Sequence, residues 1–244
     1  MCVKQPEGMR ITQLERETTI DAQADAITAL AEHAGSSFAA VNALRNFMGN
    51  EEKGFCRLRG LAARVLGSTA GAPTNWMGLD LLLKFFKERC FDADVAQVKA
   101  NNFSNLTEHF VNQAVVDAVA ETREGGGSSA PEVMDFLVEL LTFNNNLVNP
   151  WDDSHWRANV LAALGAALPP DAAHLKSVLD VLDHSLARDT VLPSCGNVVS
   201  AMNQPPQPDQ PDVSPSGSPS RTLGGGSGER FPNRNLSKWD RQPL

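Results

Sequence analysis

Apolar side chains recur at spacings of three and four residues in one segment after another, and this periodicity constrains the fold of the chain most strongly. Such spacing places side chains on one face of an α-helix, whereas a half-buried strand would alternate apolar and polar residues. The clearest stripes are Leu79, Leu82, Leu83 and Phe86; Phe103, Leu106, Phe110, Ala114, Val115 and Ala118; Val133, Leu137, Leu140 and Leu141; Leu161, Leu164 and Leu168; and Leu175, Val178, Leu179, Leu182 and Leu186. No alternating β-branched run competes with them, so the sequence predicts an all-α fold.

Residues that begin or end helices separate these stripes. Proline is favoured in the first helical turn, where its missing N–H has no intrahelical partner, so Pro131 is expected to open a helix. Asn75 is expected to be an N-cap, because its side chain can accept a hydrogen bond from a backbone N–H of the first turn. The glycines at 125–127 and the prolines at 169–170 are expected to end the helices before them.

The spacing of the expected helix pairs indicates stacked repeats. Pairs open near Ser37, Trp76, Pro131 and Ala173, at separations of 39, 55 and 42 residues. Two of these separations are close to the roughly 40–47 residues of a HEAT helix pair. Such a pair buries its apolar faces only by stacking on its neighbours. We therefore expect a HEAT/armadillo-like helical-repeat solenoid, with a four-helix bundle as the alternative.

The composition changes near residue 203. Eight of the 15 prolines lie in residues 203–244, with few large apolar side chains. Such a segment buries too little apolar surface to offset the entropy of ordering its backbone. The sequence thus predicts a disordered or partial N-terminus over residues 1–13, HEAT-like repeats over 14–202, and a disordered Pro/Ser/Gly-rich tail over 203–244. The first expected helix lacks the polar outer face of a solenoid end, so we expect the chain to be a truncated form of a longer protein.

Several classes of function are disfavoured by the composition. No apolar run reaches the roughly 18 residues of a membrane-spanning helix. There is no H-E-x-x-H motif, and the five histidines and four cysteines are scattered, so we expect no metal site and no nucleophile–base pair. A net charge of −8 disfavours a surface that coats phosphates. We therefore expect no catalytic residue, no cofactor, no membrane contact and no small-molecule substrate.

Two segments carry a more specific pattern. They read NNFSNLTEHFVNQAVVDAVAE, from residue 101, and APEVMDFLVELLTFNNNLVNPWDDSHWRANVLAAL, from residue 130. The pattern comprises an asparagine-phenylalanine start at 102–103, a P-E-V helix opening at 131–133, an aromatic-N-N-N turn at 143–146, and a tryptophan-rich helix start at 151–158. Over residues 20–202 it resembles the helical-repeat region of transcription initiation factor TFIID subunit 2, a family of TATA-binding-protein-associated factors. Asn145 and His155 depart from the family pattern, which has an aspartate and an aromatic residue there.

The resemblance implies a non-catalytic scaffold of the general transcription factor TFIID in the nucleus. It implies that the chain assembles with other TFIID subunits. It also implies that the chain helps the complex bind core-promoter DNA for the RNA polymerase II pre-initiation complex. In the family this solenoid follows a domain similar to zinc aminopeptidases, so the alternative is the C-terminal helical domain of such an enzyme. The aromatic-N-N-N…W-R-A segment favours the scaffold over this alternative and over a transport or chaperone scaffold.

The turn between the helix that Pro131 is expected to open and the helix expected to end at the prolines 169–170 is the candidate partner-binding region. Its candidate residues are Asn144, Asn145, Asn146, Trp151 and Asp153. The alternative for the three asparagines is turn chemistry, because their side chains hydrogen-bond local backbone and tolerate left-handed conformations. Trp151 is expected in the loop and Trp156 in the core.

Arginines in the expected second helices of the pairs have two interpretations. Arg57, Arg59 and Arg64 form a local basic region, and Arg157 lies in the motif near Trp156. One interpretation is contact with nucleic-acid phosphates. The favoured one is an arginine ladder, in which each guanidinium uses its fork of donors to tie adjacent turns together. Arg57, Arg59 and Arg157 are therefore candidate structural or phosphate-contacting residues.

Overall fold

The computed structural model describes residues 6–52, 54–69, 77–92, 94, 97–124, 127–147 and 149–191. By backbone contacts the chain divides into residues 1–204 and residues 205–244, and every described residue belongs to the first unit. The predicted tail, the expected N-cap Asn75 and the expected pair opening at Trp76 lie outside the described residues.

The described residues form nine α-helices, so the all-α prediction is confirmed for this part of the chain. None of the described helices is both long and apolar enough to cross a lipid bilayer. The helices are α1 (Glu7–Arg16), α2 (Ile20–Ala34), α3 (Phe38–Gly49), α4 (Cys56–Thr69), α5 (Met77–Cys90), α6 (Leu106–Ala120), α7 (Pro131–Phe143), α8 (Ser154–Ala166) and α9 (Ala172–Val191).

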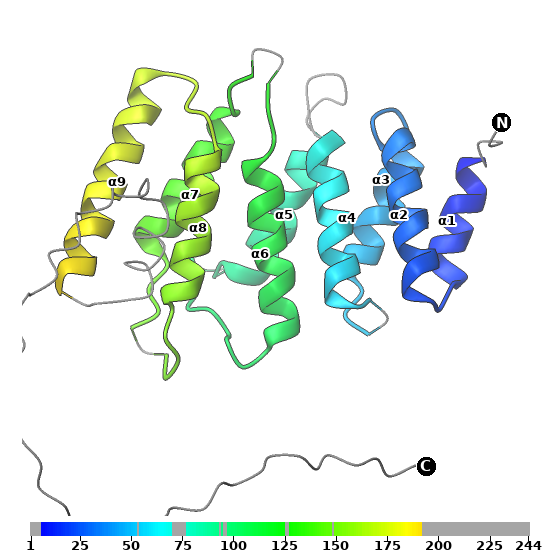
Figure 1. The fold of residues 1–244 in the computed structure, drawn as a ribbon, viewed down its shortest axis with the longest axis horizontal. Helices are drawn as coiled ribbons and strands as arrows, with labels where there is room; N and C mark the ends of the chain where they lie inside the picture. Colours follow the sequence, from blue (N-terminus) through cyan, green and yellow to red (C-terminus); the bar gives the residue numbers. More distant parts are fainter. Residues whose placement is uncertain are drawn as a thin grey trace, which may run out of the picture. The chain divides into compact units, whose positions relative to one another are not determined.

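The helices stack as repeats in two layers. In Figure 1, α2, α4, α6 and α8 stand side by side in front, and α3, α5 and α7 stand behind them. Neighbours within the front layer contact each other, as do consecutive helices such as α3 and α4, or α7 and α8. The terminal helix α9 packs on α7. This arrangement confirms the predicted helical-repeat solenoid.

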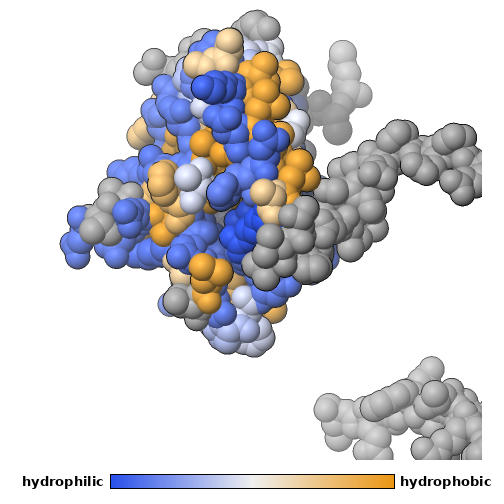
Figure 2. All heavy atoms as spheres, turned by 90° about the vertical axis from the view of Figure 1, so that its left-hand side faces the viewer, coloured by the Kyte–Doolittle hydropathy of each residue, from blue (hydrophilic) through white to orange (hydrophobic). Residues whose placement is uncertain are grey.

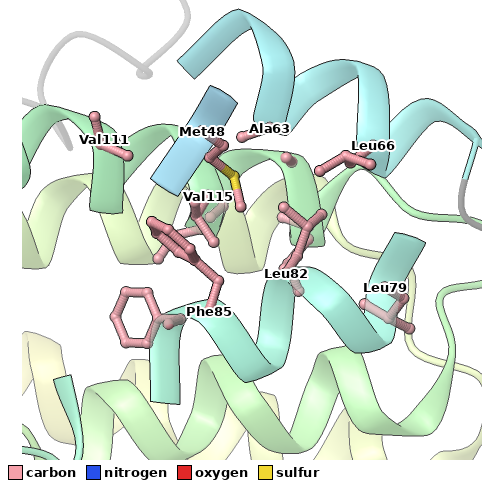
Figure 3. Close-up of a cluster of buried hydrophobic side chains, with 14 of the residues drawn as sticks. Met48, Ala63, Leu66, Leu79, Leu82, Phe85, Val111 and Val115 are labelled. Atoms are coloured by element: carbon pink, nitrogen blue, oxygen red, sulfur yellow. The ribbon is translucent and has the colours of Figure 1, made fainter. Parts of the chain in front are cut away.

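The core lies between the two layers. Figure 3 shows Met48 of α3, Leu66 of α4, Leu82 of α5 and Val115 of α6 gathered in one cluster. Each of these side chains is fully buried. Because they come from four consecutive helices, the core is continuous along the stack, as expected of repeats that cannot bury their apolar faces alone.

Small residues allow α4 and α6 to lie very close together. A Cβ atom added to Gly67 would come within 2.5 Å of the backbone oxygen of Ala118, and one added to Gly60 within 2.9 Å of the Cβ of Ala114. Real Cβ atoms essentially never make contacts this short. The two glycines therefore set the separation of α4 and α6, the central pair of the front layer.

Local sequence signals explain where several helices begin. Ser37 caps α3 by accepting a hydrogen bond from the backbone N–H of Ala40 at 3.3 Å. Asn105 caps α6 by accepting from the N–H of Glu108, also at 3.3 Å. Pro131 opens α7, as predicted. The side chains of Ser37 and Asn105 thus satisfy backbone N–H groups that have no partner within the helix.

Some details differ from the sequence-based expectations. The repeat start predicted at residue 14 lies inside α1, which already begins at Glu7. In α6, Leu106 and Phe110 are exposed although Ala114 and Ala118 on the same stripe are buried. Val111, which follows Phe110 directly, is fully buried, so this turn of α6 is covered on another side of the helix. The buried face of α6 runs through Val111, Val115 and Ala118, and Leu106 and Phe110 lie beside this face.

The leucines of α9 were also expected in a core. Of that stripe, only Val178 is buried, and Leu175, Leu179, Leu182 and Leu186 are exposed. They lie on the terminal helix of the described stack, at the end that Figure 2 views directly, where hydrophobic side chains appear among polar ones. Their spacing marks an apolar face, but no described helix covers it.

Candidate functional site

Asn144 stands at the centre of a buried hydrogen-bond network. It is the C-cap of α7 and is buried. Its Nδ2 group donates to the backbone oxygen of Lys99 at 2.7 Å and to Oδ1 of Asn101 at 3.3 Å. Its Oδ1 accepts from Nε1 of Trp156 at 2.9 Å and from Nδ2 of Asn146 at 2.7 Å. All four hydrogen-bonding positions of this amide are therefore used.

Asn146 extends the network to the chain that connects α5 and α6. Its Oδ1 accepts from the backbone N–H of Asn101 at 2.8 Å. Asn149 completes the link, because its Nδ2 donates to the backbone oxygen of Asn101 at 2.9 Å. The asparagines thus act as backbone partners for a loop more than 40 residues away, which turn chemistry alone did not predict.

The other side of this loop faces outward. Asn145 is exposed, and its Oδ1 accepts from the N–H of Leu147 at 3.0 Å in a local turn. Phe143, Leu147 and Trp151 are exposed as well. We call Phe143, Asn145, Leu147 and Trp151 the α7–α8 loop surface. Phe143 and Leu147 were not among the predicted site residues, although large apolar residues within a polar turn are a signal that could have found them.

The predicted partner-binding residues therefore fall into two groups. Asn144 and Asn146 lie inside the network, where a partner cannot reach their amides. Asn145 and Trp151 lie on the α7–α8 loop surface. Asp153 is half-buried beside both groups, with its carboxylate 3.4 Å from Nδ2 of Asn146. We restrict the partner-binding prediction to the residues that face outward.

Trp156 connects the network to the core. It is 3 % exposed, and its ring stacks on Phe86 of α5 at a centroid distance of 6.3 Å and an interplanar angle of 9°. His109 of α6 lies against it at 5.6 Å. Burial lowers the pKa of His109, so this imidazole is neutral at pH 7. The tryptophan joins α5, α6 and α8 through its ring and the α7–α8 loop through its N–H.

Arg59 is a second tie between helices. Its side chain is fully buried, and its Nε donates to the backbone oxygen of Met48 at 2.7 Å. Its two terminal nitrogens pair with the carboxylate of Glu108, and Nη2 lies 3.0 Å from Oε2. A Cβ atom at Gly54 would come within 2.6 Å of the arginine stem, so this glycine makes room for it. Arg59 thereby joins α3, α4 and α6, and its guanidinium is inaccessible to a phosphate group.

The other candidate arginines are placed differently. Arg57, one turn earlier than Gly60 on α4, is exposed, and so is Arg64. Arg157 on α8 is half-buried. Arg59 is fully buried and holds the bidentate carboxylate contact that the ladder interpretation describes.

The region offers little for covalent or metal chemistry. Cys90 is half-buried, and burial raises the pKa of its thiol to about 12, so the reactive thiolate is scarce at pH 7. Within the described part of the chain, no three His, Cys, Asp or Glu side chains are grouped so that they could hold a metal ion.

Comparison with known proteins shows which family this chain is similar to. A family model described as TAF2-like, TPR repeats matches residues 9–203. TPR repeats, like HEAT repeats, are stacked helix pairs. The match begins within α1 and includes every later helix.

Curated relatives give the same result. The chain is 31% identical over 198 residues to transcription initiation factor TFIID subunit 2 of Drosophila melanogaster, covering 79% of this chain and 16% of that protein. It is 26% identical over 214 residues to the Schizosaccharomyces pombe protein of the same name, covering 81% of this chain and 18% of that protein. For the Caenorhabditis elegans protein of this name, identity is 29% over 170 residues, covering 62% of this chain and 16% of that protein. The chain spans less than a fifth of the length of these relatives. Since the family model matches well over half of the chain, the chain belongs to the TFIID subunit 2 family.

Proposed function

We propose that the chain is a non-catalytic helical-repeat scaffold of TFIID that acts in the nucleus in transcription initiation. The observation that carries the proposal is the match of the TAF2-like repeat family to residues 9–203, which include the whole described solenoid. The curated relatives are named as subunits of transcription initiation factor TFIID. A stack of repeats suits a scaffold, because it forms an extended surface without needing a catalytic cleft.

The α7–α8 loop surface is the part of the scaffold that we propose contacts another TFIID subunit. Its apolar side chains are exposed, while the asparagines between them hold the loop from inside. A rigid loop loses little conformational entropy on binding, and exposed aromatic residues often dominate binding energy. Trp151 is therefore the expected main contact.

Core-promoter DNA is proposed to be bound by the complex as a whole. The chain carries a net charge of −8, so it offers little general attraction for phosphates. Of the candidate arginines, Arg57 and Arg157 remain proposed phosphate contacts, and Arg59 is proposed to be structural because it is buried against Glu108.

The proposal can be tested by purifying the tagged full chain together with TFIID subunits from nuclear extract. The subunits should be recovered with the wild-type chain, and Trp151→Ala should reduce their recovery. Phe38→Ala is a matched control, because Phe38 is also an exposed aromatic residue, at 65 % against 57 % for Trp151, but lies on α3. Failure of the wild-type chain to recover any TFIID subunit would overturn the scaffold proposal. Equal losses for both variants would overturn the assignment of the loop.

A further inference from the structure

The helix α9 carries an apolar face that no described helix covers. In the preceding repeats each back-layer helix contacts the front-layer helix that follows it, as α3 contacts α4, α5 contacts α6 and α7 contacts α8. Helix α9 packs on α7, and no front-layer helix follows it among the described residues. A solenoid end that meets water has a polar outer face. The exposed leucines at this end therefore indicate a contact that the described stack does not supply.

These leucines have the spacing of a coiled-coil seam. They follow one another at intervals of four, three and four residues and are each between 36 % and 56 % exposed: Leu175, Leu179, Leu182 and Leu186. Alternating intervals of three and four keep a row of apolar side chains directed at one neighbouring helix. We call these four residues the α9 leucine row. The row thus fits a helix that lies along α9.

The two flanks of the α9 leucine row differ in their surroundings. On one flank Val178 and Ser185 are buried, on the side where α9 packs on the solenoid. On the other flank Lys176 and Asp183 are exposed. They are seven residues apart, so they occupy the same position beside the row and carry opposite charges. Charges at such flanking positions determine which helix can pair and in which orientation.

We propose that the helix lying on the α9 leucine row is α9 of a second copy of this chain, in an antiparallel pair about a two-fold axis. If Leu179 of one copy faces Leu182 of the other, Leu175 faces Leu186 in the same register. The row is therefore complementary to itself, as an interface between identical copies requires.

The same register also pairs the flanking charges. Lys176 of one copy lies beside Asp183 of the other, and the two-fold axis forms this ion pair twice. A parallel pair would instead place Asp183 beside the buried Val178 of the other copy, and neither ion pair would form. Charge complementarity thus favours a second copy in the antiparallel orientation.

The contact is small, because each copy contributes one row of four partly exposed leucines. An interface at the low end of the known size range implies a weak dimer, with a dissociation constant on the order of 10–100 µM. The inference rests on α9 alone and does not depend on the proposed role in TFIID.

Sedimentation velocity of the full chain between about 5 and 500 µM tests the proposal, because this range spans the expected dissociation constant. The mean mass should rise from 26.3 kDa towards twice that value as the concentration increases. A wild-type chain that stays monomeric throughout would overturn the proposal. This is the result expected if residues 192–244 or a different protein covers the α9 leucine row.

Two leucine variants locate the interface. Leu179→Glu places a charge within the row and should weaken dimerisation at least about tenfold. Leu106→Glu is the matched control, because Leu106 is 58 % exposed against 53 % for Leu179 but lies on α6, and it should dimerise like the wild type. Undiminished dimerisation of Leu179→Glu would place the interface elsewhere and overturn the proposal.

Two charge variants test the register, and both change exposed side chains. Lys176→Glu and Asp183→Lys each replace two attractive pairs by two repulsive ones, so each should weaken dimerisation about tenfold. An equimolar mixture of the two variants should recover wild-type affinity, because the new negative charge at 176 then faces the new positive charge at 183. Wild-type affinity of either variant alone, or a mixture that dimerises no better than its components, would contradict the antiparallel pair. If Leu179→Glu does not fold, these two variants and their mixture decide.

Discussion

Trp156→Ala should strongly destabilise the described solenoid. Trp156 is 3 % exposed and stacks on Phe86 at 6.3 Å, so its removal leaves a cavity between α5, α6 and α8. Deleting a buried tryptophan or phenylalanine typically costs about 3–5 kcal/mol of unfolding free energy. The hydrogen bond from Nε1 to Asn144 accounts for about 1 kcal/mol of this loss. The expected loss for Trp156→Ala is therefore about 3–5 kcal/mol.

Two further variants divide this loss into its parts. Trp156→Phe keeps an aromatic ring in contact with Phe86 but removes the N–H, so it should lose about 1–2 kcal/mol. Asn144 would still accept from Asn146 at 2.7 Å, which limits the penalty. Trp151→Ala removes a side chain that is 57 % exposed and should change stability by no more than about 0.5 kcal/mol.

Urea unfolding of all four proteins, followed by circular dichroism, gives these free energies. The reasoning predicts the order wild type, Trp151→Ala, Trp156→Phe, Trp156→Ala, from the most stable to the least. Equal losses for Trp151→Ala and Trp156→Ala would show that the start of α8 is misplaced. Equal losses for the two Trp156 variants would show that the hydrogen bond to Asn144, and not the ring, dominates.

Three further predictions follow from the helix contacts and the buried imidazole. Gly67→Ala should lower the unfolding free energy by about 1–3 kcal/mol because the new Cβ meets the α6 backbone, whereas Gly165→Ala, which enters open space, should raise it by about 0.5 kcal/mol in the same urea assay. Arg59→Ala should cost about 3–5 kcal/mol because it leaves a carboxylate without its buried partner, and exposed Arg57→Ala should leave the melting curve nearly unchanged. Burial lowers the pKa of His109, so the unfolded chain takes up this proton first, and stability should fall as pH drops below the ordinary value of 6.5. Urea unfolding at a series of pH values should show this slope, and His109→Gln should flatten it.

Local features of the fold could be predicted well from the sequence. The start of α7 at Pro131 follows from the chemistry of a single residue. Trp156, Val160 and Leu164 share one face because they are four residues apart, and all three are buried. Trp151 precedes the helix and is exposed, as expected. Each of these predictions uses information contained within a few neighbouring residues.

Contacts between distant segments could not be predicted in the same way. Arg59 and Glu108 are 49 residues apart, and the sequence around either residue does not indicate that the two will pair. The amide of Asn144 reaches Lys99, 45 residues away. Turn chemistry described the local bond of Asn145 correctly, yet it gave no reason for two neighbouring asparagines to be buried. Their partners became definable only once the helices had been stacked.

Periodicity likewise identifies a face without showing whether another helix covers it. Leu179 and Val178 are adjacent and equally apolar, but Val178 is buried and Leu179 is exposed. Apolar residues at the same kind of helical spacing are buried in the core in α7 but are exposed on α9. Whether an apolar face is buried depends on the position of its neighbours, which is a property of the assembled stack.

Buried and exposed side chains alternate along residues 144–147. This alternation explains how one short loop supports both the asparagine network and the α7–α8 loop surface. Directly after Phe143 the backbone is extended at Asn144, with φ −73° and ψ 95°. Successive side chains of extended backbone point to opposite sides. Asn144 and Asn146 accordingly point inward and hold the loop before α6, while Asn145 and Leu147 point outward. The inward amides cannot move without leaving buried donors unpaired, so the outward side chains are presented on a fixed base.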